Sequence, residues 1–169
     1  MSKAIVITLI GDDRSGIVED VSRIIVEHDG EWVESRMANL SGKFAGVLRA
    51  NLPDERCESF TEALKSGVSD LRITIEQAGV DAAVSEKTYR LELVGQDRPG
   101  IVHRISSALA QNGATVDEME SEVVEASMSG EQLFKASIVL RPADGKNIDE
   151  LGEVLEQIAN ELIVDIELG

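Results

Sequence analysis

The chain is 169 residues long, carries a formal net charge of −16 and contains a single cysteine, Cys57. No basic block offsets the acidic excess, which argues against direct binding to nucleic acid, because such binding requires Lys and Arg side chains at the phosphates. One cysteine excludes an intrachain disulfide and a multi-cysteine metal site. No apolar run approaches a membrane span, and the first one, at 5–10, is too short for a signal peptide, so we expect a cytoplasmic protein without membrane contact.

In the first half of the chain, hydrophobic periodicity predicts the order strand, helix, strand, strand, helix, strand. The predicted elements are a strand at 5–10, a helix to about 28, strands at 32–40 and 43–52, a helix from 53 to 67 and a strand at 71–75. Both faces of the first strand are fairly apolar. We therefore expect helices on one face and a second domain or a partner chain on the other.

The second half repeats this order after a polar, small-residue linker. The predicted elements are a strand at 88–94, a helix at 99–112, strands at 115–125 and 132–141, a helix at 148–160 and a strand at 162–168. A βαββαβ unit folds most simply as a ferredoxin-like sandwich, with two helices on one face of an antiparallel sheet. The sequence thus predicts an α+β protein of two tandem ferredoxin-like units, at 1–78 and 87–169, joined by a linker at 79–86.

One eight-residue stretch, which follows the first strand of each half, supports the duplication. Residues 11–18 read GDDRSGIV and residues 95–102 read GQDRPGIV, an offset of 84 residues with six identical positions. After each copy, apolar residues fall at the i, i+1, i+4, i+7, i+8 spacing of one helix face. A repeated strand, loop and helix indicates a repeated domain. Because each unit has only about 80 residues, we expect the units to pack on each other or the chain to form a homodimer.

The repeated loop has the composition of an anion-binding helix start. Its glycine lacks a Cβ and leaves room for another group, its aspartate can accept hydrogen bonds from the first helical amides, and its arginine adds positive charge beside them. A helix cap with a salt bridge would explain the same residues without any ligand, and both interpretations stay open. The positions are Asp13, Arg14 and Gly16 in the first copy and Asp97, Arg98 and Gly100 in the second.

The pattern G-x-D-R-P-G-I-V between the first strand and first helix of a βαββαβ unit resembles the ACT domain, a small-molecule-sensing regulatory module. Two such units in a chain of this length resemble the family of glycine cleavage system transcriptional repressors. The segment ESRMANL at 34–40, with Gly42 and Phe44, is also similar to the first half of that family. The resemblance covers nearly the whole chain.

In amino-acid-binding ACT domains, the loop amides and a residue at the start of the second strand, often Asn, hold the ligand at an interface between two units. This chain departs from the pattern there, with Glu31-Trp32 and Thr115-Val116 at the comparable positions, and Ser15 replaces the proline in the first copy. We expect the second copy, which keeps the full D-R-P-G-I, to be the better site. The resemblance implies as ligand-binding residues Asp13, Arg14, Ser15, Gly16, Ile17, Asp97, Arg98, Pro99, Gly100, Ile101 and Thr115.

The sequence therefore predicts a non-enzymatic regulator that binds an amino acid or similar small carboxylate and acts on transcription through a protein partner, such as a transcription regulator. No triad or phosphate-binding motif is present, and His28 and His103 lack metal-ligand spacing, so we expect no catalytic residue, metal or cofactor. Two alternatives stay open. One is a detached regulatory subunit of an ACT-bearing enzyme, like the N-terminal unit of formyltetrahydrofolate deformylases, and the other is a ligand-free dimerisation module.

Overall fold

A computed structural model describes residues 1–79, 87–162 and 164–169. The chain divides into two compact units, Met1–Ala82 and Ala83–Gly169. The predicted linker at 79–86 lies outside the described residues, apart from Gly79.

Both units have the order βαββαβ, which confirms the predicted fold class. In unit 1 the elements are β1 (Ser2–Asp12), α1 (Ile17–Glu27), β2 (Glu31–Leu40), β3 (Lys43–Pro53), a 3₁₀ turn η1 (Asp54–Arg56), α2 (Cys57–Gly67) and β4 (Leu71–Gln77). In unit 2 they are β5 (Tyr89–Gln96), α3 (Ile101–Gln111), β6 (Thr115–Glu125), β7 (Gln132–Arg141), α4 (Ile148–Leu162) and β8 (Val164–Leu168).

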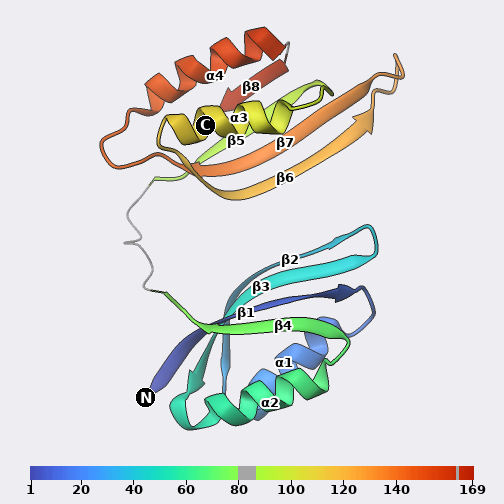
Figure 1. The fold of residues 1–169 in the computed structure, drawn as a ribbon, viewed down its shortest axis with the longest axis vertical. Coiled ribbons are helices and arrows are strands. Elements are labelled where there is room, and N and C mark those ends of the chain that lie inside the picture. Colours follow the sequence, from blue (N-terminus) through green and yellow to red (C-terminus); the bar gives the residue numbers. More distant parts are fainter. Residues whose placement is uncertain (80–86, 163) are drawn as a thin grey trace. The chain divides into compact units, whose positions relative to one another are not determined.

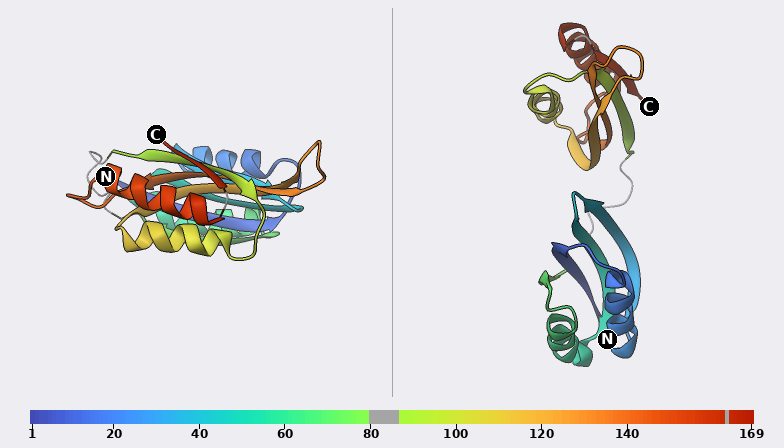
Figure 2. Two further views of the ribbon diagram at one scale, coloured as in Figure 1. Left: turned by 90° about the horizontal axis from the view of Figure 1, so that it is seen from above. Right: turned by 90° about the vertical axis from the view of Figure 1, so that its right-hand side faces the viewer.

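Each unit contains one four-stranded antiparallel sheet with its two helices on one face (Figures 1 and 2). The strand order is β2-β3-β1-β4 in unit 1 and β6-β7-β5-β8 in unit 2, so the first strand of each unit is an inner strand. Equivalent register pairs place Gly11 opposite Leu71 and Gly95 opposite Val164. The repeated loop thus leaves the same end of an inner strand in both units.

The core of each unit lies between the sheet and its helices and consists almost entirely of aliphatic side chains. On β1, Ile5, Ile7 and Leu9 point into this core, because alternate residues of a strand face opposite sides. The opposite face, with Val6, Thr8 and Ile10, carries no helix, and Ile10 is 48% exposed. Within unit 1, β1 therefore has one apolar face buried in the core and a second face, with Val6 and Ile10, that no helix covers.

Three of the element boundaries that differ from those predicted have a clear physical reason. β1 is longer because it pairs with β3 along its whole length, from Ser2 opposite Pro53 to Asp12 opposite Lys43. Helix α4 continues to Leu162, which was expected in the last strand, because Leu162 extends the apolar stripe that begins at Leu151. Helix α3 begins at Ile101, so Pro99 lies in the turn before the helix.

A glycine in the left-handed conformation precedes the first helix of each unit. Gly16 and Gly100 both have φ of 82°, a region that costs other L-residues about 1–2 kcal/mol. A Cβ built at Gly100 meets no atom within 4 Å. The turn therefore selects glycine through backbone conformation and not through crowding.

We expect Gly100→Ala to lower the free energy of unfolding by about 1–2 kcal/mol, and Gly100→Asn to lower it less, because Asn tolerates this backbone region. Urea unfolding measures both. Gly79→Ala is the matched control, since Gly79 lacks a positive φ and a Cβ there also meets nothing. Equal stability of Gly100→Ala and Gly79→Ala would contradict the conformational explanation.

Candidate functional site

The two repeated loops are held in the same way at the end of the inner strand. The amide of Asp13 donates to the carbonyl of Gly42, and the amide of Asp97 donates to the carbonyl of Gln132, both at 2.9 Å. Each loop is thereby fixed to its neighbouring hairpin strand before it enters the helix. The structure confirms that the two copies share one backbone geometry, so differences in chemistry must come from side chains.

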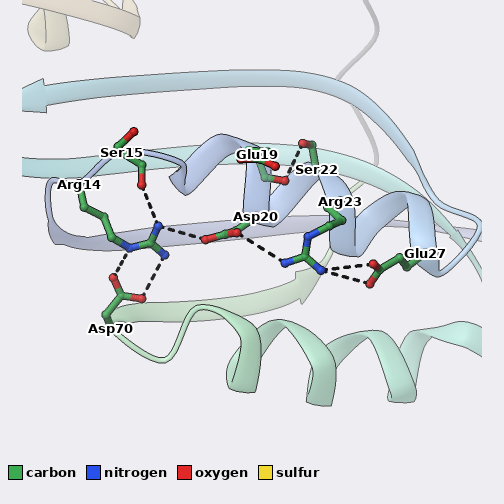
Figure 3. A network of polar contacts seen from close by, with 8 residues as sticks. All are labelled: Arg14, Ser15, Glu19, Asp20, Ser22, Arg23, Glu27 and Asp70. Carbon is green, nitrogen blue, oxygen red and sulfur yellow. Dashed lines mark hydrogen bonds and ion pairs between the residues drawn. The ribbon is translucent and has the colours of Figure 1, made fainter.

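In unit 1 the loop arginine is enclosed by two carboxylates (Figure 3). Arg14 Nε donates to Asp70 Oδ2 at 2.6 Å and Nη2 donates to Asp70 Oδ1 at 3.3 Å. Its Nη1 lies 3.0 Å from Asp20 Oδ2 and also donates to the Ser15 carbonyl at 3.1 Å. Arg14 therefore joins the loop to the first turn of α1 and to the turn between α2 and β4.

These contacts change the acidity of the partners in the expected direction. The hydrogen bond from Arg14 lowers the pKa of Asp70 below its ordinary value, because it stabilises the ionised carboxylate. The pKa of Arg14 is raised, first by its hydrogen bond to Asp70. The network continues along α1, where Arg23 lies between Asp20 and Glu27 (Figure 3).

The other acidic groups of the first loop also have partners within the unit. The Asp13 carboxylate accepts a hydrogen bond from the Asn39 side chain, and Lys43 pairs with Asp12. The possibility that Asp13 caps the helix is not realised, because Gly16 occupies the cap position of α1 and the Asp13 carboxylate bonds Asn39 instead. The side chain of Asn39, on β2, therefore donates to Asp13 in place of the helical amides.

In unit 2 the loop arginine has a different environment. Arg98 Nη2 donates to Gln96 Oε1 at 3.4 Å, and Arg98 forms no ion pair among the described residues of the chain. The position equivalent to Asp20 is Arg104, which pairs with Glu161 on α4. Asp97 is exposed and does not cap α3, whose cap position, Gly100, likewise receives no side-chain bond. The second loop thus contains an aspartate and an arginine that are consecutive in sequence.

The remaining predicted site residues fall into two groups. Ile17 and Ile101 are 3% and 4% exposed, so their side chains belong to the cores and only their backbone faces the loop. Ser15, Pro99 and Thr115 are exposed, and Thr115 is the first residue of β6. The loop residues of each copy therefore lie together, and the isoleucines belong to the cores. Thr115 does not join its loop, because it pairs with Arg141 at one end of β7 whereas the loop is bonded to Gln132 at the other end.

Asp70 and Asp20 were not predicted as part of the first loop. Asp70 lies 56 residues from Arg14, in a turn without any recognisable motif. Its place beside the loop follows from the pairing of β1 with β4, which puts Leu71 opposite Gly11. The strand order of the predicted fold was the only signal that could have suggested it.

An apolar groove lies beside the second site, between α3 and the edge strand β6. Its side chains are mainly aliphatic, and three of them, Val102, Val116 and Met119, are 42%, 40% and 39% exposed. The groove is lined by Leu93, Val102, Ile105, Ser106, Leu109, Val116, Met119, Phe134, Ala136 and Ile138. This surface suits an apolar partner or the apolar part of a ligand.

Within the described ranges, no group of three or more His, Cys, Asp or Glu side chains is arranged to hold a metal ion. None of the described helices has the length and apolar character needed to cross a membrane.

Comparison with solved structures finds chains of the same two-unit fold. A protein of unknown function from Galdieria sulphuraria is 29% identical, with a TM-score of 0.89 over 99% of this chain and 98% of that one. A protein provisionally assigned as a glycine cleavage system transcriptional repressor is 19% identical, with a TM-score of 0.71 over 100% of this chain and 97% of that one. At 19% identity, this second likeness concerns the fold alone.

Among curated sequences, the chaperone protein DnaK of Burkholderia cenocepacia strain HI2424 is 26% identical over 128 residues. The match includes 72% of this chain, and the chain spans about a fifth (20%) of the length of that chaperone. DnaK from two strains of Burkholderia orbicola gives the same values. These likenesses assign no chaperone activity to the chain.

Two family models match the chain, both described as ACT domains. One matches residues 3–78 and the other residues 89–160, which together include most of both units. The matches agree with the βαββαβ order and with the repeated strand-loop-helix turn. The chain therefore belongs to the ACT-domain proteins, with one ACT domain in each of its two units.

Proposed function

We propose that this tandem ACT-domain protein is a non-enzymatic sensor that binds an amino acid at the Asp97–Gly100 loop of unit 2. One observation carries the proposal: Arg98, in the loop that leads into α3, has no carboxylate partner within the described residues. The first amides of a helix have no intrahelical acceptor and favour an anion. Arginine and amides together offer several charge-assisted hydrogen bonds to one carboxylate.

Two further features support an amino acid over a simple anion. Asp97 and Arg98 are adjacent and of opposite charge, which matches the ammonium and carboxylate groups of a zwitterion. Gly100 has open space where a side chain would stand, so a ligand can approach the backbone. The groove beside α3, which includes Val102 and Met119, offers apolar surface for a side chain of the ligand.

The sensor acts on transcription through a protein partner and not by contact with DNA. Both halves of the chain carry an acidic excess, and duplex DNA is densely negative. The fold shared with the provisionally assigned repressor is consistent with such a role. A detached regulatory subunit of a metabolic enzyme would use the same loop, and pull-down of its partner distinguishes the two roles.

Binding of a ligand to the folded state must raise the melting temperature, so a thermal-shift panel of the twenty amino acids tests the proposal. We expect at least one to stabilise the protein. Arg98→Gln should then weaken binding about 10- to 100-fold, as expected for loss of a hydrogen bond between charged groups. Calorimetric titration measures the affinity.

Arg90→Gln is the matched control for this variant. Arg90 is an exposed arginine of the same unit, and it bonds Ser137 and lies near Glu92 on the strands of the sheet, outside the loop. Its replacement should leave the affinity unchanged. If no amino acid stabilises the protein, the chain is better explained as a ligand-free dimerisation module. Equal affinity of Arg98→Gln and the wild type would place the ligand elsewhere.

The protein also self-associates under this proposal, and the edge of unit 2 is the surface that supports it. β6 has a strand partner on one side only, and Val116, Met119 and Val123 point to the same side of the sheet as the core. All three are at least 39% exposed, and a long edge strand with apolar side chains favours association. Covering them would remove apolar surface from water.

Sedimentation velocity should therefore show a dimer at micromolar concentration, and Met119→Lys should shift it toward the monomer, because an edge lysine opposes strand addition. Val26→Lys is the control, since Val26 is an exposed apolar residue of α1 in the other unit. A monomeric wild type would contradict self-association, and a dimer unaffected by Met119→Lys would assign it to another surface.

We expect no retention of duplex DNA by the purified protein at physiological salt, because no basic stripe offsets the acidic excess. Electrophoretic mobility of operator-length fragments, at protein concentrations up to tens of micromolar, measures this. Binding that persists as salt rises, in the absence of any other protein, would overturn the partner-mediated mechanism.

A further inference from the structure

The environment of Arg14 has the geometry of a filled carboxylate site. Two N–H groups of the guanidinium, Nε and Nη2, donate to the two oxygens of Asp70, at 2.6 and 3.3 Å. Paired hydrogen bonds of this kind are how arginine recognises a carboxylate ligand. In unit 1, therefore, a carboxylate of the chain itself occupies the place where an external one would bind (Figure 3).

Little hydrogen-bonding capacity remains at this arginine. Its Nη1 is directed to Asp20 and to the carbonyl of Ser15, at 3.0 and 3.1 Å. A side chain held beside its partner also acts at an effective concentration of millimolar or more, which a dilute free carboxylate must overcome. The lowered pKa of Asp70 agrees with this contact, since it shows that the arginine stabilises the ionised form.

Unit 2 has fewer carboxylates at the equivalent described positions. The 84-residue offset and the strand register relate five described positions of the two units. In unit 1 they are Asp12, Asp13, Arg14, Asp20 and Lys43, with a formal charge of −1, to which Asp70 adds a further −1. In unit 2 they are Gln96, Asp97, Arg98, Arg104 and Leu133, with a formal charge of +1, which Glu161 offsets because it pairs with Arg104. The first loop is therefore acidic, and the second is close to neutral.

We propose that the Asp70 carboxylate occupies the carboxylate-binding position of Arg14 in unit 1, so that each chain binds an external carboxylate only at Arg98, in unit 2. This inference rests on the proposed function only for the identity of the natural ligand. The closure of the first loop by Asp70 applies to carboxylates in general. It assigns different roles to the two ACT domains. Unit 2 binds the external carboxylate, and unit 1 keeps the same backbone turn with its anion site occupied by Asp70.

Acetate, the simplest stable carboxylate with a methyl group, serves as the probe in an NMR titration of the full chain labelled with ¹⁵N. In the wild type we expect acetate to move the Arg98 Nε–H and Gly100 amide signals but not those of Arg14 and Gly16. In Asp70→Asn all four should move, with the affinity of the first loop raised about tenfold or more. Asp54→Asn is the control, because it removes the same charge from an exposed aspartate of unit 1 outside the loop.

Each result decides the proposal. Movement of Arg14 and Gly16 in the wild type would overturn the closure, and so would their silence in a folded Asp70→Asn variant. A response of the first loop in Asp54→Asn would show that charge alone, and not the Asp70 contact, closes the site. Should Asp70→Asn fail to fold, the wild-type titration still decides between one responsive loop and two.

The proposed function fails separately from this inference. If acetate moves only the second loop of the wild type while no amino acid raises the melting temperature, the sensor function is wrong and the closure by Asp70 stands. If an amino acid binds with two sites per wild-type chain in calorimetry, the sensor function stands and the closure is wrong.

Discussion

Both units depend on one backbone constraint, the left-handed glycine between the inner strand and the first helix. With φ of 82° at Gly16 and Gly100, the chain reverses from the sheet into a helix whose apolar stripe packs back onto the sheet. The turn is fixed on the other side by the amide of the loop aspartate, which bonds the adjacent hairpin strand. Arginine, amides and an open glycine are therefore delivered to the same place twice, whatever the surrounding side chains are.

The surroundings then decide what each turn can do. A duplicated fold duplicates its backbone donors, but not the residues that approach from other elements. Asp70 comes from the turn before β4, and Asp20 comes from the first turn of α1. In unit 2 the position equivalent to Asp20 is Arg104, whose charge has the opposite sign. Because a guanidinium prefers a carboxylate partner wherever one is held close, the arginine of unit 1 is a structural tie, whereas that of unit 2 bonds Gln96 and has no carboxylate partner among the described residues.

The sequence was sufficient for the fold because its information is local and repeated. Apolar alternation and helical spacing identified the order of elements in both halves, and the 84-residue repeat confirmed each half against the other. Boundaries were less accurate where tertiary contacts decide them, as for Leu162, which joins the helix stripe instead of the last strand. Whether Asp13 caps the helix stayed open because a short motif cannot show that Asn39, on another strand, competes for its carboxylate.

The difference between the two arginines could not be read from the motif, since both copies contain D-R and both fit a salt-bridged cap. It follows only when the strand order brings residue 70 beside residue 14, which makes the contact a property of the fold and not of the loop. Motif identity between repeats establishes a common turn, whereas ligand capacity depends on the charges that neighbouring elements bring to it. Here the less acidic environment of the second turn, its Asp97-Arg98 pair and the adjoining apolar surface are what make unit 2 the candidate site of the proposed function.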